Sequence, residues 1–193
     1  MKLTALSVSD LLAAFRSSEP TPGGGSASAL SSAVGASLLA MVAGLPKPDA
    51  TTEEDLNRLA HAGRRAAELA VELEALIDQD SAAYELVVGA FRLPKATDEE
   101  KTARTAAIQR ALVAATEAPL EVMRKTAAVL SLAPAVADHG NRNASSDVAV
   151  AIGLLKAGLL GARANVEINL GSLKDAGYVA RVREESARLS GSA

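Results

Sequence analysis

The sequence predicts an all-α fold: a single-domain helical bundle over residues 1–193, with long antiparallel helices that also pair the chain into a homodimer. Alanine supplies 42 of the 193 residues and has the highest intrinsic helix propensity. Apolar residues recur at steps of three and four over about nine helical turns, the spacing of helices that pack lengthwise. No segment shows a convincing strand pattern.

Composition excludes several classes of protein. The formal net charge is −3 and the basic residues are interspersed with acidic ones, so we expect no nucleic-acid partner. The absence of cysteine excludes disulfides, thiolate zinc sites and cysteine nucleophiles. Only His61 and His139 could supply imidazole, and we expect no metal site.

The uncharged stretch from Pro20 to Pro46 is long enough to span a bilayer. It opens with glycines, carries five serines and has few large aliphatic residues, which favours the central helix of a soluble bundle. The N-terminus shows no secretory signal. We therefore expect a cytoplasmic protein without a membrane partner.

The first helices are predicted from caps and breakers. Ser7, with Asp10 at the capping-box position, begins a short helix to about residue 17. Residues 19–25 are expected to form a loop, and a helix of small residues follows from Ser26 to about Gly44. Pro46 and Pro48 then break the chain.

The longest helix is predicted to begin at Thr52, with an acidic first turn that complements the helix dipole. It carries one apolar seam, in which a single aspartate takes the place of a hydrophobic residue: Leu56, Leu59, Gly63, Ala66, Ala70, Leu73, Ile77, Asp80, Tyr84 and Val87.

Thr97 is predicted to cap the next helix, which Pro119 should kink or restart and Pro134 should bend. The polar loop 138–147 leads into an apolar helix over about 146–170, and a weaker helical segment follows to about residue 189. A smooth stripe on the apolar helix, made of Gly153, Ala157 and Gly161, is expected to receive another backbone.

Three features of the sequence are not explained by the packing of a helical bundle alone. The first is the run at a helix N-terminus made of Thr21, Pro22, Gly23, Gly24, Gly25 and Ser26, which could bind an anionic ligand or only form a tight turn with a serine cap. The second is Asp80, which could transfer protons or could pair with an arginine or a helix terminus.

The third feature is the loop with Asn141, Asn143, Ser146 and Asp147, which offers many directed hydrogen bonds and could equally be ordinary helix capping. Farther along the same helix, Asn165 and Asn169 lie one turn apart. They either tie helices together or contact a polar ligand, and we favour the structural role.

Three segments, 20–29, 93–101 and 140–147, carry a resemblance. They recur in this order and at similar spacing in the cyclodeaminase/cyclohydrolase family, which comprises the folate-handling domain of formiminotransferase-cyclodeaminase and its stand-alone bacterial relatives. The sequence resembles this family from about Leu11 to Val179. The resemblance implies an all-helical homodimer that acts on a one-carbon unit carried by tetrahydrofolate, with no other cofactor and with a formiminotransferase as a partner.

The resemblance implies conversion of formiminotetrahydrofolate to methenyltetrahydrofolate with release of ammonia. The alternatives are hydrolysis of methenyltetrahydrofolate to formyltetrahydrofolate, or a folate-binding helical dimer without turnover. Either reaction needs a proton acceptor and an acid for the leaving nitrogen, and Asp80 and Asp147 are the candidates. The candidate substrate-binding residues are Thr21, Pro22, Gly23, Gly24, Gly25, Ser26, Lys95, Asn141, Asn143 and Ser146. Relatives carry a lysine-rich run where this chain has residues 46–49 with one lysine, which motivates the alternative without turnover.

Overall fold

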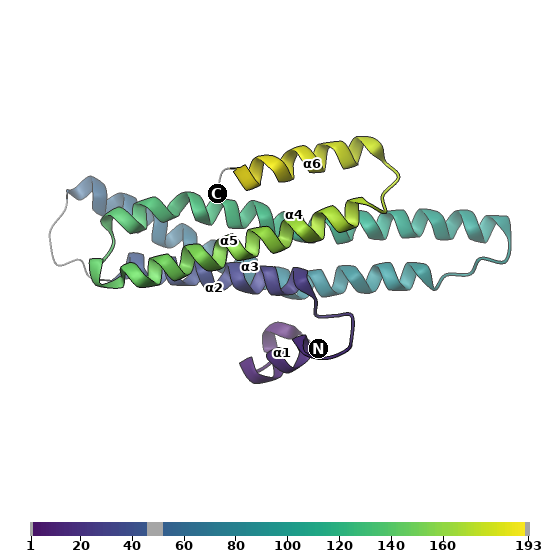
Figure 1. Cartoon of the computed structure of the whole chain (residues 1–193), viewed down its shortest axis with the longest axis horizontal. Helices are drawn as coiled ribbons and strands as arrows, with labels where there is room; N and C mark the ends of the chain where they lie inside the picture. Colours follow the sequence, from purple (N-terminus) through teal and green to yellow (C-terminus); the bar gives the residue numbers. More distant parts are fainter. Residues whose placement is uncertain (1, 46–51, 192–193) are drawn as a thin grey trace.

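The computed structural model describes residues 2–45 and 52–191, and within these ranges it contains helices and no strand (Figure 1). The α-helices are α1 (Val8–Phe15), α2 (Gly24–Gly44), α3 (Glu53–Phe91), α4 (Asp98–His139), α5 (Ser145–Leu170) and α6 (Ala176–Gly191). Short 3-10 turns, η1 (Leu3–Ala5) and η2 (Arg142–Ala144), precede α1 and α5. The all-α prediction is confirmed; the predicted break at Pro46 and Pro48 and the departure at 46–49 lie outside the described residues.

The four long helices form an elongated bundle in which α2 packs against α3, α4 and α5 (Figure 1). The hairpin of α3 and α4 extends beyond the other helices at one end, and α6 packs on α4 and α5. The short helix α1 stands as an arm on the opposite side of the bundle from α6. The turn before the arm is fixed to α3, because Leu3 N and Thr4 Oγ1 donate to Asp78 at 2.5 and 2.7 Å.

The predicted helix starts at Ser7, Thr52 and Thr97 are confirmed. Each of these side chains accepts a hydrogen bond from a backbone N–H three residues later, and Thr97 forms a full capping box with Glu100. These caps depend on residues close in sequence, so they are readable from the sequence.

The predicted seam of α3 is buried through its middle. Leu59, Ala66, Leu73 and Ile77 are in the core, whereas the seam's early and late members are partly open, with Leu56 46% and Tyr84 41% exposed. Small residues set the spacing between helices: a Cβ on Gly63 would lie 2.8 Å from the Cβ of Ala43 on α2. The seam therefore packs against a helix of its own chain.

Two predictions about α4 and α5 are corrected. Pro119 does not restart the helix, because α4 runs continuously from Asp98 to His139 through both of its prolines. On α5 the stripe of Gly153, Ala157 and Gly161 is mostly outward, and the buried face carries Ala151, Leu155, Gly158 and Ala162. A strict four-residue step drifts around a helix of 3.6 residues per turn, whereas alternating steps of four and three stay on one face.

Two segments, Gly24–Gly44 and Arg142–Leu170, are long and apolar enough to cross a membrane when judged by length and composition alone. The core helix of a soluble protein meets the same criterion. The contacts of α2 with three other long helices fit that second description.

Candidate active site

The first turn of α2 consists of glycines that lie against two polar side chains. The helix begins at Gly24, with Gly23 as an N-cap that provides no side-chain hydrogen bond, so the prediction of a start at Ser26 with a serine cap is wrong. No described glycine has a positive φ, so the turn does not require glycine for its backbone conformation. The glycines instead allow close approach: a Cβ on Gly25 would overlap the Asp80 carboxylate, and one on Gly24 would lie 3.3 Å from Asn165 Nδ2.

Asp80 reaches this turn from the middle of α3 and is partly buried there. The Ser26 hydroxyl lies 3.1 Å from Asp80 Oδ2, and the Ser26 backbone N–H also bonds to the carboxylate. Burial raises the pKa of the Asp80 carboxyl, and the two hydrogen bonds from Ser26 oppose part of that rise. No cation among the described residues contributes to the shift, so the predicted alternative of an arginine partner gives way to a helix terminus.

Ser26 lies beneath the turn rather than on it. Its side chain is 0% exposed, and its Oγ lies 2.8 Å from the Ile77 carbonyl oxygen and 3.1 Å from Ser81 Oγ. Its side chain therefore faces α3 rather than the surface, and its expected substrate-binding role stays a prediction. Sequence reasoning missed Ser81 altogether, although a serine directly after the seam aspartate was a visible signal.

Asn165 contacts the glycine turn from α5. Its Nδ2 donates to Gly161 O at 2.8 Å, one turn earlier in its own helix. The two helices are close here, since a Cβ on Gly161 would overlap the hydroxyl of Ser28. The glycine turn is thus enclosed by α3 on one side and α5 on the other.

The residues of the proline-glycine run before Gly25 lead into the first turn of α2, where Asp80 lies. Thr21, Pro22 and Gly23 are partly buried, Gly24 is exposed, and the Thr21–Pro22 peptide bond is cis. The structure therefore places Gly25 and Ser26, both buried, directly against Asp80, while the other four residues of the run precede them with at least part of their surface open.

Lys95 is not brought to this place. It is exposed in the connection between α3 and α4. Because α3 continues from Asp80 to Phe91, the connection begins about 16 Å farther along the helix axis.

The loop with Asn141 and Asn143 lies at the opposite end of α5. Asn141 caps η2 and accepts a hydrogen bond from Asn143 N at 3.0 Å, while Ser146 and Asp147 are in the first turn of α5. Asp147 and Asn165 are separated by about 27 Å along the axis, since a helix rises about 1.5 Å per residue. Within one chain, therefore, the two candidate carboxylates Asp80 and Asp147 do not share a site.

The described residues contain no group of three or more His, Asp or Glu side chains arranged to hold a metal ion. His139 lies 3.6 Å from Asp55, where α4 ends beside the start of α3, and His61 is exposed. Neither histidine lies with Asp80.

Comparison with known proteins finds consistent similarities. A family model described as formiminotransferase-cyclodeaminase matches residues 7–188. A methenyltetrahydrofolate cyclohydrolase from Methylorubrum extorquens is 41% identical over 174 residues, which cover 89% of this chain and 82% of that protein. The formimidoyltransferase-cyclodeaminase of Gallus gallus is 34% identical over 169 residues, which cover 87% of this chain and 31% of that longer protein. The crystal structure of formiminotetrahydrofolate cyclodeaminase from Thermotoga maritima superposes with a TM-score of 0.86 at 25% identity, covering 99% of this chain and 91% of that one.

Proposed function

Because the chain belongs to the formiminotransferase-cyclodeaminase family, we propose that it is an enzyme that acts on the one-carbon unit of a tetrahydrofolate. The observation that carries the proposal is the Asp80 carboxylate, which lies against the glycine turn of α2 and has no cationic partner in the part of the chain that the structure describes. A carboxyl group with a raised pKa holds a proton more readily than an ordinary aspartate does, which suits it to accept a proton and return it.

Hydrolysis of methenyltetrahydrofolate to formyltetrahydrofolate is the reaction we favour, because the relative named a cyclohydrolase is 41% identical, whereas the solved cyclodeaminase is 25% identical. The second candidate is the conversion of formiminotetrahydrofolate to methenyltetrahydrofolate with release of ammonia. The similarity to the solved cyclodeaminase, which extends over nearly the whole chain, favours it. Under that candidate a formiminotransferase supplies the substrate.

In the hydrolytic reaction, water attacks the cationic carbon that bridges two folate nitrogens. A C–O bond forms, the π electrons of the C=N bond move to nitrogen, and Asp80 accepts a proton from the water. The C–N bond then breaks as the carboxyl group returns its proton to the leaving nitrogen, and the hydroxyl releases its own proton to solvent as the C=O bond of the formyl group forms. In the ammonia-releasing reaction a folate nitrogen is the nucleophile instead of water, and the same carboxylate passes the proton toward the departing ammonia. Tetrahydrofolate carries the one-carbon unit, and neither step calls on another cofactor.

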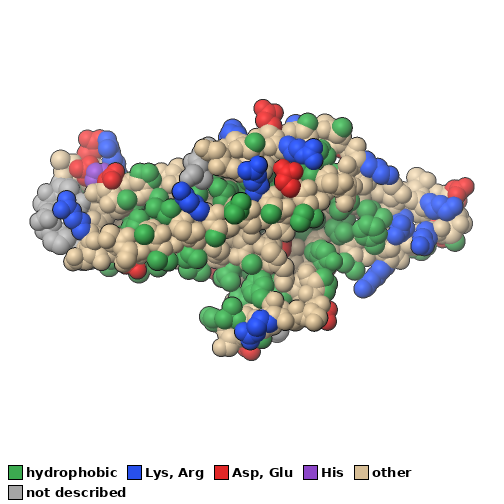
Figure 2. Space-filling model, viewed as in Figure 1, with side chains coloured by type: hydrophobic (Ala, Val, Ile, Leu, Met, Phe, Trp, Pro, Cys, Tyr) green, Lys and Arg blue, Asp and Glu red, His purple; other side chains and the backbone are tan. Residues whose placement is uncertain are grey.

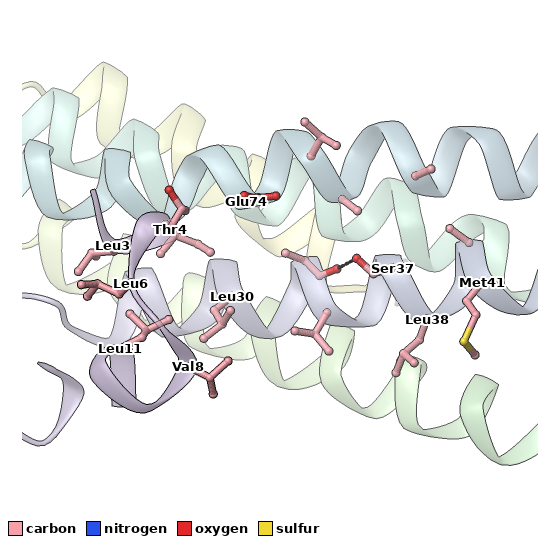
Figure 3. Close-up of a pocket in the computed structure, with 17 residues that line it drawn as sticks. Leu3, Thr4, Leu6, Val8, Leu11, Leu30, Ser37, Leu38, Met41 and Glu74 are labelled. Atoms are coloured by element: carbon pink, nitrogen blue, oxygen red, sulfur yellow. Dashed lines mark hydrogen bonds between the residues drawn. The ribbon is translucent and has the colours of Figure 1, made fainter. Parts of the chain in front are cut away.

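We propose that this enzyme is a cytoplasmic homodimer. An apolar groove of about 740 Å³ opens between the N-terminal arm, α2 and α3 (Figure 3), and its α2 wall includes Leu30, Val34, Leu38 and Met41. Val34 and Met41 are 43% and 45% exposed. Figure 2 also shows hydrophobic side chains along the middle of one face of the bundle and where the arm meets it. A second copy would cover this apolar surface.

The dimer also bears on Asp147. An antiparallel partner would bring the 141–147 loop of one chain toward the middle of the other, so that Asp80 and Asp147 come from different chains. Such an arrangement restores the two-carboxylate division of work that a single chain does not contain.

The test is a pair of assays on one preparation. Loss of methenyltetrahydrofolate absorbance measures the hydrolytic reaction. Appearance of that absorbance from formiminotetrahydrofolate, together with release of ammonia, measures the ammonia-releasing reaction. Turnover in either assay supports the proposal of an enzyme if the substitution Asp80→Asn abolishes that turnover. If folate stabilises the protein saturably but neither assay shows turnover, the alternative of a folate-binding dimer without turnover would replace the enzyme.

A further inference from the structure

We propose that Ser26 is a positioning residue: its hydroxyl holds the Asp80 carboxylate in place and changes its hydrogen-bond partner when that carboxylate gains or loses a proton. The inference rests on the proposed function in one respect, namely that Asp80 changes protonation state during the reaction. It differs from the expected role of Ser26 as a substrate contact and fits the complete burial of its side chain.

Three groups on one face of α3 surround the hydroxyl. The Ile77 carbonyl, the Asp80 carboxylate and the Ser81 hydroxyl come from positions separated by three and four residues, which places them side by side along the helix. Ser26 Oγ lies 2.8 Å from Ile77 O, 3.1 Å from Asp80 Oδ2 and 3.1 Å from Ser81 Oγ. All three distances are within hydrogen-bonding range.

A hydroxyl carries one hydrogen, so Ser26 donates to only one of these acceptors at a time. When Asp80 is ionised, Ser26 donates to Oδ2 and accepts from Ser81. When Asp80 is protonated, its O–H donates to Ser26 Oγ, and Ser26 turns its hydrogen to Ile77 O. The Ile77 carbonyl is also an acceptor within its own helix, so it keeps a partner in both states. Neither state leaves a buried donor or acceptor without a partner.

Within residues 2–45 and 52–191, no other charged group takes this role. α2 contains no titratable side chain, and no charged side chain of α3, α4 or α5 contributes to the pKa shift of Asp80. The nearest carboxylate along α3, Asp78, is occupied by Leu3 N and Thr4 Oγ1. Burial raises the pKa of Asp80, and Ser26 supplies the hydrogen bonds that lower it.

The experiment compares Ser26→Ala with Ser32→Ala in the full chain. Ser32 is also 0% exposed on α2, but its hydroxyl meets Thr126 Oγ1 at 2.8 Å and not Asp80. The pKa of Asp80 is read from the carboxyl carbon in an NMR titration of ¹³C-labelled protein without substrate, with Asp80→Asn assigning the signal. The acid limb of kcat/KM is measured against pH in parallel.

We expect Ser26→Ala to raise the pKa of Asp80 by about one pH unit, because the hydrogen bond lost by the ionised form is charge-assisted and stronger than the one lost by the protonated form. The acid limb of kcat/KM should move by the same amount, while Ser32→Ala moves neither. An unchanged pKa in Ser26→Ala, or an equal change in Ser32→Ala, overturns the inference. If the pKa moves but the limb does not, the hydrogen-bond exchange stands and the proposed use of Asp80 in turnover fails.

Ser81→Ala gives a second measurement should Ser26→Ala not fold. Loss of the Ser81 donor weakens the arrangement only when Asp80 is ionised, so the pKa of Asp80 should rise again, by less. An unchanged pKa in Ser81→Ala rejects the exchange on its own.

Discussion

The carboxylate of Asp80 lies in the space that a side chain on Gly25 would occupy. A Cβ at Gly25 would overlap the carboxyl group and lie 2.6 Å from Oδ2, while the backbone at this residue has no positive φ. The absence of a side chain on α2 is therefore what allows the aspartate of α3 to reach the first turn of the helix. This relationship gives separate expectations for the adjacent glycines.

Gly25→Ala should reduce turnover about 100-fold or more, because the added methyl group displaces the group that we propose moves the proton. The backbone tolerates alanine, so the protein should remain folded, as measured by circular dichroism. A Gly25→Ala enzyme with normal turnover would contradict the assignment of Asp80.

Gly24→Ala is the matched substitution one residue earlier. Among the described residues its methyl group would meet only the Asn165 amide, with Nδ2 at 3.3 Å and Oδ1 at 3.9 Å, and Gly24 is exposed. We expect loss of folate binding by calorimetry with a change of no more than about 1 kcal/mol in the free energy of unfolding. Unchanged folate binding in Gly24→Ala would contradict a role in ligand binding and would mean that the glycine run only forms a tight turn at the start of the helix.

Asp80→Asn should lower turnover by about two to four orders of magnitude while retaining the shape of the side chain. Its effect on stability has a defined pH dependence. The folded-state pKa of Asp80 is raised, so the folded protein binds this proton more tightly than the unfolded chain does, and stability falls as pH rises between the unfolded and folded values.

Asparagine does not titrate, so the stability of Asp80→Asn relative to the unmodified protein should increase with pH over that window and then stay constant. Chemical denaturation at a series of pH values from about 4 upward measures the difference. A relative stability that decreases with pH would mean that a cation or stronger donors stabilise the ionised carboxylate.

Much of this arrangement was readable from the sequence, and the reason is local. The caps at Ser7, Thr52 and Thr97 depend on hydrogen bonds within one turn, and Asp80 was identified because it interrupts an otherwise apolar seam. The start of α2 was misplaced because glycine at the start of a helix is favoured here by contacts with α3 and α5, which are distant in sequence.

The separation of Asp80 from Asp147 was also implicit in the sequence. The predicted apolar helix over 146–170 is about 36 Å long at 1.5 Å per residue, so a loop at its beginning lies far from whatever packs at its end. Family resemblance groups motifs by order along the chain and carries no information on which end of a helix, or which chain, they occupy.

The continuity of α4 through Pro119 depends on a contact that no local pattern encodes. Proline has no N–H, so it leaves the carbonyl of Ala115, four residues earlier, without its helical donor. The Asn169 side chain of α5 donates to that carbonyl at 2.7 Å. The expected structural role for Asn169 is thereby confirmed: it ties α5 to α4 at the position where the backbone needs a donor.

Asn169→Ala should destabilise the protein by about 1–2 kcal/mol in chemical denaturation, since it leaves the Ala115 carbonyl without a partner. In a Pro119→Ala background the new N–H of residue 119 bonds to that carbonyl, so the same asparagine substitution should cost much less. The double-mutant cycle isolates this coupling. Equal costs in the two backgrounds would show that Asn169 acts through some other contact.

The last prediction concerns the two carboxylates that one chain keeps apart. If Asp80 of one chain and Asp147 of the other form a site, Asp80→Asn and Asp147→Asn should each inactivate the homodimer. In a mixed dimer of the two variants, one site receives both substitutions and the other receives neither. Purification with two different tags isolates that mixed dimer, and it should recover about half of the unmodified activity. A site within one chain predicts no recovery, because every site then carries one substitution. An active Asp147→Asn homodimer would remove Asp147 from the chemistry and leave Asp80 as its carboxylate, and a monomer by sedimentation would reject the shared site.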